Sequence, residues 1–117
     1  MTTNNHEVIF AIVNAGYAED AMRVAREEGA RGGTIISGRG VANEKEATFF
    51  GIAVHAEKEL LMLVVETEMR DRILHALYKQ MGMQQKAQGI VFSLPVSEAA
   101  GLSKPSEDEK NKHAPLF

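Results

Sequence analysis

Four short runs of mostly apolar residues along the chain have the pattern of β-strands. The first and third are almost wholly apolar, which is typical of central strands covered on at least one face. The second is entered through a pair of glycines, and the fourth opens at a glycine and stops at Pro95. Together they predict strands over residues 7–13, 33–37, 59–65 and 89–94.

Two segments between these runs have the three-to-four-residue period of an amphipathic helix. The first starts at Ala18, carries acidic residues in its first turn and has Gly29 past its end. In the second, apolar residues recur every four positions, with Thr67 as a candidate cap and Gly82 as a candidate stop. The order strand, helix, strand, strand, helix, strand predicts an α+β, ferredoxin-like βαββαβ fold, in which both helices cover one face of an antiparallel four-stranded sheet.

The third strand predicts a second apolar surface. Its run, ELLMLVV, is apolar on both faces, whereas the helices cover only one. Another copy of the same sheet is the simplest cover, so we expect a homo-oligomer of cyclic symmetry. A monomer whose tail folds across the sheet is the alternative, but residues 103–112, SKPSEDEKNK, contain no large apolar side chain.

The tail differs in composition from the rest of the chain. We expect a folded domain over residues 1–102 and a polar, flexible tail over residues 103–117. At its end, Leu116 and Phe117 are either frayed or docked on a partner or a neighbouring subunit, and fraying is the commoner outcome at a terminus.

Composition narrows the chemistry. The chain has 117 residues, a formal charge of −3 and no cysteine, which removes disulfides, thiol nucleophiles and cysteine-ligated metals. Its mild acidity argues against nucleic acid as a partner, and the third strand lacks the aromatics of an RNA-binding sheet. No cationic and apolar leader stands at the start, and no apolar run approaches the roughly 18 residues of a membrane span. We expect a cytoplasmic protein with no direct membrane insertion.

A glycine-rich stretch around the second strand offers groups that bind phosphate. Residues 29–40, GARGGTIISGRG, combine glycines with the hydroxyls of Thr34 and Ser37 and the guanidinium of Arg39. The spacing matches neither the phosphate-binding loop ending in GK[ST] nor the dinucleotide-binding fingerprint. The same glycines also suit a structural role as helix stop, strand entry and loop base, and composition alone favours that role.

A long polar loop is expected over residues 38–57, which show no clear period before Phe49. Loops of that length in compact domains are usually functional or mobile. Phe49 and Phe50 form an aromatic pair that either anchors a partner or packs within the sheet assembly, and packing is favoured.

These elements and motifs resemble those of the PII-like nitrogen-regulatory signalling proteins over roughly residues 7–96. The specific parts are RGGTII at the second strand, Gly40 at the loop base, Lys58 before ELLMLVV and Gly89 at the fourth strand. The resemblance implies a non-enzymatic regulator, a homotrimer with its sheets packed into a barrel, and adenine nucleotides in clefts between subunits. It also implies a loop that contacts a target, here a membrane transporter or a metabolic enzyme.

Carried over by position, the resemblance implies roles for particular residues. Thr34 is similar to the family's hydroxyl near the adenine, Gly40 to its nucleotide-contacting loop glycine, and Lys58 to a lysine near the effector pocket. The expected ligand-binding residues are Thr34, Ser37, Gly38, Arg39, Gly40, Lys58, Lys86 and Gly89. The expected partner-binding residues of the loop are Asn43, Glu44, Lys45, Phe49 and Phe50.

The chain also departs from the family's pattern. The loop lacks a modifiable tyrosine, because Tyr17 and Tyr78 lie in or near the helices, so uridylylation of the loop is not expected. In the connector before the fourth strand only Lys86 is available as a cation, and the pair of arginines expected after that strand is missing, with Glu98 in that segment instead. Fewer cations favour a less charged ligand, so we expect ADP, AMP or a small anion in preference to ATP, or no nucleotide. These departures, with a short loop, resemble divergent branches of the family that accompany transporters.

The alternative function uses the histidines. His6 and His55 each precede a predicted strand, and we expect that they are able to approach one another near the loop carboxylates. A small ferredoxin-like enzyme or a trimeric metal-binding protein is therefore the alternative, although the four histidines lack metal-ligand spacing. Nothing desolvates the acidic residues beside the loop, such as Glu59, and the serines have no histidine partner nearby in sequence. Catalytic residues, bound metals and required cofactors are not expected.

Overall fold

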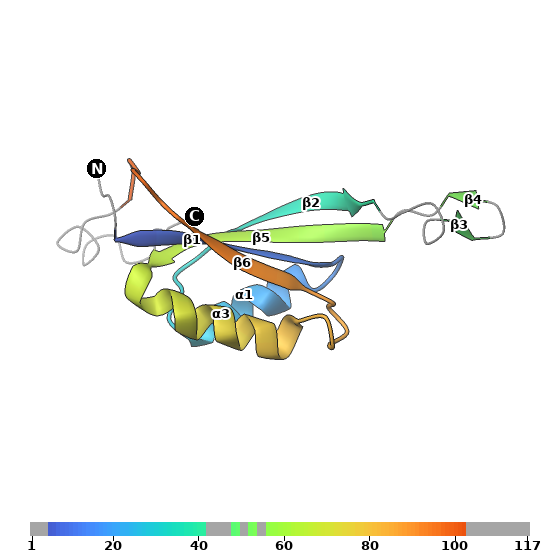
Figure 1. The fold of residues 1–117 in the computed structure, drawn as a ribbon, viewed down its shortest axis with the longest axis horizontal. Coiled ribbons are helices and arrows are strands. Elements are labelled where there is room, and N and C mark those ends of the chain that lie inside the picture. Colours follow the sequence, from blue (N-terminus) through green and yellow to red (C-terminus); the bar gives the residue numbers. More distant parts are fainter. Residues whose placement is uncertain (1–4, 42–47, 50–51, 54–55, 103–117) are drawn as a thin grey trace.

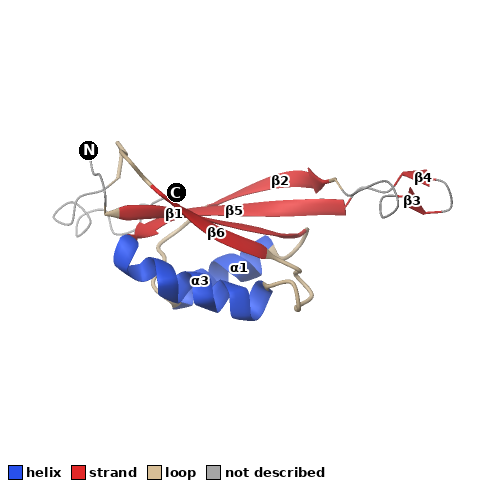
Figure 2. Cartoon of the chain, viewed as in Figure 1, coloured by secondary structure: helices blue, strands red, loops and turns tan. Residues whose placement is uncertain are grey.

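The computed structural model describes residues 5–41, 48–49, 52–53 and 56–102. The elements in chain order are β1 (His6–Asn14), α1 (Ala18–Glu27), β2 (Thr34–Gly40), β3 (Thr48–Phe49), β4 (Ile52–Ala53), β5 (Ala56–Glu66), α3 (Thr67–Met81) and β6 (Ile90–Pro95). The long strands form an antiparallel sheet of order β2-β5-β1-β6, and β3 pairs with β4 in a separate two-stranded sheet. Both helices lie on one face of the larger sheet (Figures 1 and 2). The predicted ferredoxin-like fold is confirmed.

The observed interval between the long strands is shorter at both ends than the loop predicted over residues 38–57. β2 continues to Gly40 and β5 begins at Ala56, and the two pair up to the register Gly40 with Ala56. The pairing extends through polar and glycine residues because a strand ladder needs only backbone N–H and C=O groups, which these residues supply. The interval between the two long strands is therefore residues 41–55, and it contains β3 and β4.

The hydrophobic core fills the space between the helices and one face of the sheet. Along β1 and β5, buried residues alternate with partly exposed ones, as expected for strands with one face on a core. The alanines of α1 are fully buried, and such small side chains let a helix lie close to the sheet. The largest fully buried side chains are Ile9, Val13, Val24, Leu61, Leu63, Ile73 and Leu77.

The start of α3 differs from the sequence expectation. The N-cap is Glu66, with an extended backbone, and Thr67 is the first helical residue. β5 stays paired with β1 up to the register His6 with Glu66, so the extended conformation ends only there. The backbone N–H of Thr67 donates to the carbonyl of Asn5, while its Oγ1 is buried with no hydrogen-bond partner within the described residues. Thr67 is therefore not the cap, whereas the helix does end at Gly82 as predicted.

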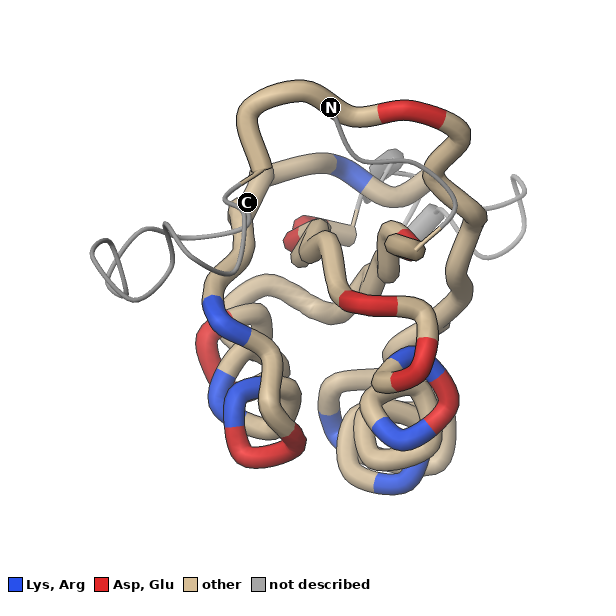
Figure 3. Tube along the Cα trace, turned by 90° about the vertical axis from the view of Figure 1, so that its left-hand side faces the viewer, with Lys and Arg blue, Asp and Glu red and all other residues tan. Residues whose placement is uncertain are grey.

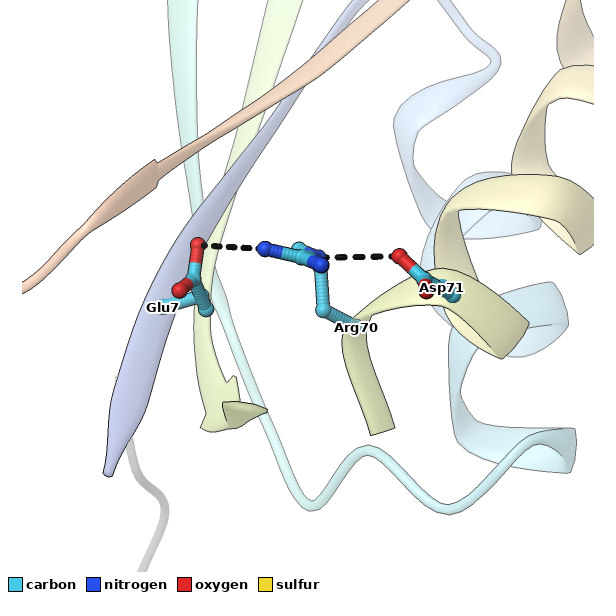
Figure 4. Close-up of polar contacts among 3 residues, drawn as sticks. All are labelled: Glu7, Arg70 and Asp71. Atoms are coloured by element: carbon cyan, nitrogen blue, oxygen red, sulfur yellow. Dashed lines mark hydrogen bonds and ion pairs between the residues drawn. The ribbon is translucent and has the colours of Figure 1, made fainter. Parts of the chain in front are cut away.

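A charged group is buried under α3. Glu7, on the core face of β1, is only 7% exposed and lies 3.5 Å from Nη1 of Arg70. Arg70 also donates through Nε to Oδ1 of Asp71 at 2.9 Å (Figure 4). The hydrogen bond and charge of Asp71, with a smaller contribution from Glu7, raise the pKa of Arg70 above its usual value. The arginine therefore stays charged, and Glu7 keeps a cationic partner.

The face of the sheet that the helices leave uncovered is apolar, and we call it the open sheet face. Strand alternation places apolar residues from all four strands on it. Phe10 and Phe92 stack there with ring centroids 5.3 Å apart. Phe92 is 40% exposed and Ile90 is 55% exposed. The expected second apolar surface is present; its members are Val8, Phe10, Ile12, Ile36, Leu60, Met62, Val64, Ile90, Phe92 and Leu94.

Charged residues are concentrated on the helices, with both signs interspersed, and are sparser along the sheet (Figure 3). Arg23, for example, lies 3.5 Å from Glu27 and 4.0 Å from Asp20 on α1, and these pairs are exposed. Exposed pairs of this kind stabilise a helix only slightly. No helix in the described part of the chain has the length and apolarity needed to cross a membrane.

Candidate functional site

Lys58 lies on the open sheet face near the start of β5. It is opposite Gly38 of β2 on one side and Asn14 of β1 on the other. Its Nζ donates a hydrogen bond of 2.8 Å to Oδ1 of Asn14. A Cβ atom at Gly40 would lie 3.2 Å from Cε of Lys58, whereas one at Gly38 would have nothing within 4 Å. The glycine at position 40 thus makes room for the lysine stem, and the space over Gly38 is open.

The connector between α3 and β6 is hydrogen-bonded to Asn14, the partner of Lys58. The carbonyl of Lys86 accepts a hydrogen bond of 3.1 Å from Nδ2 of Asn14, and the carbonyl of Ala87 accepts one of 2.9 Å from its backbone N–H. Gln88 has a φ of 49°, and Gly89 donates through its N–H to the carbonyl of Met81 at 2.6 Å. We call this group the loop-base cluster, and its members are Asn14, Gly38, Gly40, Lys58 and residues 86–89.

Glu59, the neighbour of Lys58, faces the opposite side of the sheet and caps α1. Its Oε1 accepts hydrogen bonds from the N–H groups of Gly16, at 2.9 Å, and Ala18, at 3.0 Å. The helix's own N-cap residue, Tyr17, makes no side-chain cap bond, so a carboxylate from β5 satisfies the first free N–H groups. Sequence reasoning treated Glu59 as a residue beside the loop, because an interaction across more than forty positions leaves no local signal.

The comparisons with known proteins identify the family of this chain. A family model described as "Nitrogen regulatory protein P-II" matches residues 6–105. The chain belongs to the P-II family. Members of this family are regulatory signalling proteins and not enzymes, so the expected class of function is confirmed at that level. A search of curated proteins finds no match to the chain.

A solved structure supports the P-II fold independently. The crystal structure of Arabidopsis thaliana PII bound to citrate is similar to this chain with a TM-score of 0.56 and 21% sequence identity. The match covers 80% of this chain and 77% of the Arabidopsis chain. At that identity the likeness supports the fold alone.

Five of the residues expected from the P-II resemblance, Thr34, Ser37, Gly38, Arg39 and Gly40, lie on the two faces of β2, which is an edge strand and almost wholly exposed. Strand alternation places Thr34 on the same face as Lys58. Ser37 and Arg39 lie on the other face, where Arg39 is opposite Glu57. Within one subunit, therefore, Arg39 and Lys58 do not converge.

The other residues expected from the P-II resemblance lie in the connector, in β3 or outside the described residues. Lys86 joins the loop-base cluster through its backbone, and its side chain is exposed. Gly89 is required by the close return of the connector, because a Cβ atom there would collide with the carbonyl oxygen of Met81. Of the partner-binding residues, Phe49 lies in β3, and the other four are outside the described residues: Asn43, Glu44, Lys45 and Phe50. Leu116 and Phe117 are also outside them.

The predicted approach of His6 and His55 stays a prediction, because the structure describes the position of His6 alone. His6 is opposite Glu66, at the end of β5, whereas Ala56, which follows His55, begins that strand. From Ala56 to Glu66 the strand advances by ten residues, which corresponds to about 33 Å. His55 itself is outside the described residues. Within the described residues there is also no group of three His, Asp or Glu side chains suited to a metal ion.

An apolar groove of about 470 Å³ lies between α3 and β6 and meets the loop-base cluster at Gly89. Its lining is mostly apolar, and it ends at the edge of the open sheet face, where Ile90 belongs to both. Of the groups expected to bind an anion, the ammonium of Lys58 lies in the loop-base cluster next to the connector, so we place the candidate ligand site there. The groove is lined by Leu74, His75, Tyr78, Met83, Gly89, Ile90 and Val91.

Proposed function

We propose that this P-II family member is a ligand-responsive regulator. In this proposal, a homotrimer binds an adenine nucleotide or a small anion between subunits and controls a transporter or a metabolic enzyme through residues 41–55. The observation that carries the proposal is the position of Lys58. It lies on the open sheet face, at the base of the loop, and among the described residues its ammonium group is paired with an amide and not with a carboxylate.

Assembly through the open sheet face is the first part of the proposal. Ile36 is 45% exposed and Leu94 is 51% exposed, and both lie on this face with the Phe10–Phe92 stack. A contiguous apolar surface drawn from four strands is unusual on a monomer, and a second copy of the same surface covers it with matching chemistry. Stable interfaces bury about 800 Å² per partner, so assembly of this kind would draw on side chains from all four strands.

Sedimentation tests this part directly. The wild-type protein is expected to sediment as a trimer at micromolar concentration, and Phe92→Asp is expected to give monomers, because a carboxylate on this face would be buried without a partner. A folded wild-type monomer at that concentration would refute assembly through the sheet.

Ligand binding beside Lys58 is the second part. The ammonium group attracts an anion at the edge of the surface that assembly would cover, and the glycine at position 38 leaves open space next to it. Arg39 lies on the other face of this edge strand, opposite Glu57, so the proposed contact with the ligand beside the open sheet face comes from Lys58. With few cations near the site, ADP and AMP are the favoured ligands over ATP.

Calorimetry with ATP, ADP, AMP and inorganic phosphate tests this part. Lys58→Gln is expected to lower affinity for every one of these ligands that binds, whereas Lys79→Gln, which removes an exposed lysine of α3, is the matched control. Equal affinity of the Lys58→Gln variant and the control would remove Lys58 from the site.

Regulation through the loop follows from its attachment. Residues 41–55 begin next to Gly40 and end next to Ala56, and these two residues pair with each other beside Lys58. A ligand that contacts one arrangement of the loop better than another shifts the population toward it. Hydrogen exchange of residues 41–55 with and without ADP is the measurement, and unchanged exchange would contradict this step. In keeping with the P-II family, the compartment we propose is the cytoplasm.

A further inference from the structure

Asn14 contacts both halves of the loop-base cluster. At the oxygen end of its amide, Oδ1 accepts a hydrogen bond of 2.8 Å from Nζ of Lys58. At the nitrogen end, Nδ2 donates 3.1 Å to the carbonyl of Lys86 and 3.5 Å to Oε1 of Gln88. One side chain therefore joins the loop base on β5 to the connector before β6.

The neighbours of the amide determine its orientation. With the oxygen and nitrogen exchanged, an NH₂ group would face the ammonium of Lys58, and an oxygen would face the carbonyl of Lys86. Both contacts would be repulsive, because the first would pair two donors and the second two acceptors. The position therefore calls for a side chain that accepts at one end and donates at the other, which an amide does.

Charge distinguishes an amide from a carboxylate of the same shape at this position. Aspartate would accept from Lys58 equally well, but it would neutralise the ammonium group and place a second acceptor against the carbonyl of Lys86. Asparagine orients Lys58 and leaves its full positive charge. The Lys58–Asn14 bond is partly buried, so this charge is less screened than that of an exposed lysine.

We infer that Asn14 is a positioning and specificity residue of the ligand site: its amide fixes Lys58 beside the connector and keeps the lysine's charge available to an anion. This inference rests on the proposed function and adds the residue that assembles the site. The ligand class that it selects is a small anion or the phosphate of a nucleotide, held by Lys58 and approached by the connector at residues 86–89.

The backbone of Asn14 is held independently of its side chain. Its N–H donates to the carbonyl of Ala87, and its carbonyl accepts from the N–H of Tyr17 at 3.1 Å. It is also the last residue in the register of β1 with β5, opposite Lys58. Variants at this position therefore keep the turn into α1, and the effect of the amide is measurable apart from folding.

The test compares three variants of the full chain in calorimetric titrations with ADP and with inorganic phosphate. Asn14→Asp is expected to weaken binding of both by about tenfold or more, because the carboxylate competes for Lys58. Asn14→Ala is expected to weaken it by only a few-fold, because the charge remains while the positioning is lost. Asn5→Asp makes the same chemical change at the far end of the sheet, and is expected to leave both affinities within about twofold of wild type.

Salt dependence separates electrostatics from structure. The wild-type affinity is expected to fall as salt rises, and the Asn14→Asp affinity to change much less, because its lysine is already neutralised. If Asn14→Asp binds both probes like wild type, or loses no more affinity than Asn14→Ala, the inference is overturned while the proposed function stands. If the wild-type protein binds neither ADP nor phosphate, the proposed ligand class and this inference both fail.

A double-mutant cycle decides the case if Asn14→Asp does not fold. The single variants Asn14→Ala and Lys58→Gln are compared with the double variant in ADP affinity. If the double variant loses less affinity than the sum of the two single losses, the assignment is supported, because the amide then acts through the lysine. Strictly additive losses overturn it.

Discussion

Removal of the Glu59 carboxylate is expected to destabilise the fold through α1. The carboxylate accepts two backbone hydrogen bonds at the start of this helix, 2.9 Å from the N of Gly16 and 3.0 Å from the N of Ala18. The helix has no side-chain cap of its own, so Glu59→Ala leaves these N–H groups without their acceptor.

The magnitude follows from the two roles of this carboxylate, as a hydrogen-bond acceptor and as a negative charge. Removal of a capping side chain costs about 0.5–2 kcal/mol, and removal of a negative charge at a helix N-terminus adds about 0.3–1 kcal/mol. Glu59→Ala is therefore expected to lower the free energy of unfolding by about 1–3 kcal/mol. Glu59→Gln keeps an acceptor oxygen but removes the charge, so it is expected to lower the free energy of unfolding by the smaller, electrostatic share alone.

Urea denaturation at several protein concentrations is the measurement, because assembly would make the apparent stability depend on concentration. Glu57→Ala is the matched control: this carboxylate lies two residues earlier on the same face of β5, and its side chain makes no hydrogen bond to any described residue. A decrease below about 0.5 kcal/mol for Glu59→Ala, or one equal to that of the control, would refute the capping argument.

Three further predictions concern the core, the connector and the buried ion pair. Leu77→Ala removes a fully buried side chain of α3 and is expected to lower the free energy of unfolding by about 2–5 kcal/mol in urea denaturation, with an unchanged m-value; a decrease below about 1 kcal/mol would contradict its place in the core. Gly89→Ala forces a Cβ atom against the Met81 carbonyl and is expected to cost about 1–3 kcal/mol, whereas Gly38→Ala, with nothing within 4 Å, is expected to cost much less; equal thermal shifts for the two would contradict this. The pKa of Arg70 is raised in the folded state, so the stabilisation that its charge provides is present below the pKa of the unfolded state and is lost only as the pH rises through the pKa of the folded state. The destabilisation by Arg70→Gln is therefore expected to be constant from about pH 6 to 9. A marked slope in that range would show that another group titrates together with Arg70.

The order of the elements was predictable because it depends on local patterns. The apolar runs and the four-residue stripe of α3 are visible within a dozen residues of sequence, and the fold follows from their order. The start of α3 was predicted one residue late, at a capping Thr67, because local spacing does not show that β5 stays paired with β1 through Glu66. The predicted strands 33–37 and 59–65 stop short of Gly40 and Ala56, since pairing between β2 and β5 is a property of two distant segments.

The candidate site was less accessible to sequence reasoning. Lys58 was named through a family resemblance, while Asn14 was not predicted as a site residue, because its partners lie 44 and 72 positions away along the chain. Arg39 and Lys58 were expected to act on the same ligand, yet the alternation of β2 and β5 places them on opposite faces. Spacing identifies which residues a strand carries, whereas register is needed to tell which of them meet.

The adjacent pair Lys58 and Glu59 has a consequence for how the sheet avoids mispairing. A slip of β5 by one position would exchange the faces of its residues. The ammonium of Lys58 would then approach the positive end of α1, and the carboxylate of Glu59 would lie on the open sheet face, where we propose that an anion binds. Both exchanges are electrostatically unfavourable, so two neighbouring side chains of opposite sign penalise the wrong alignment from both sides of the sheet at once.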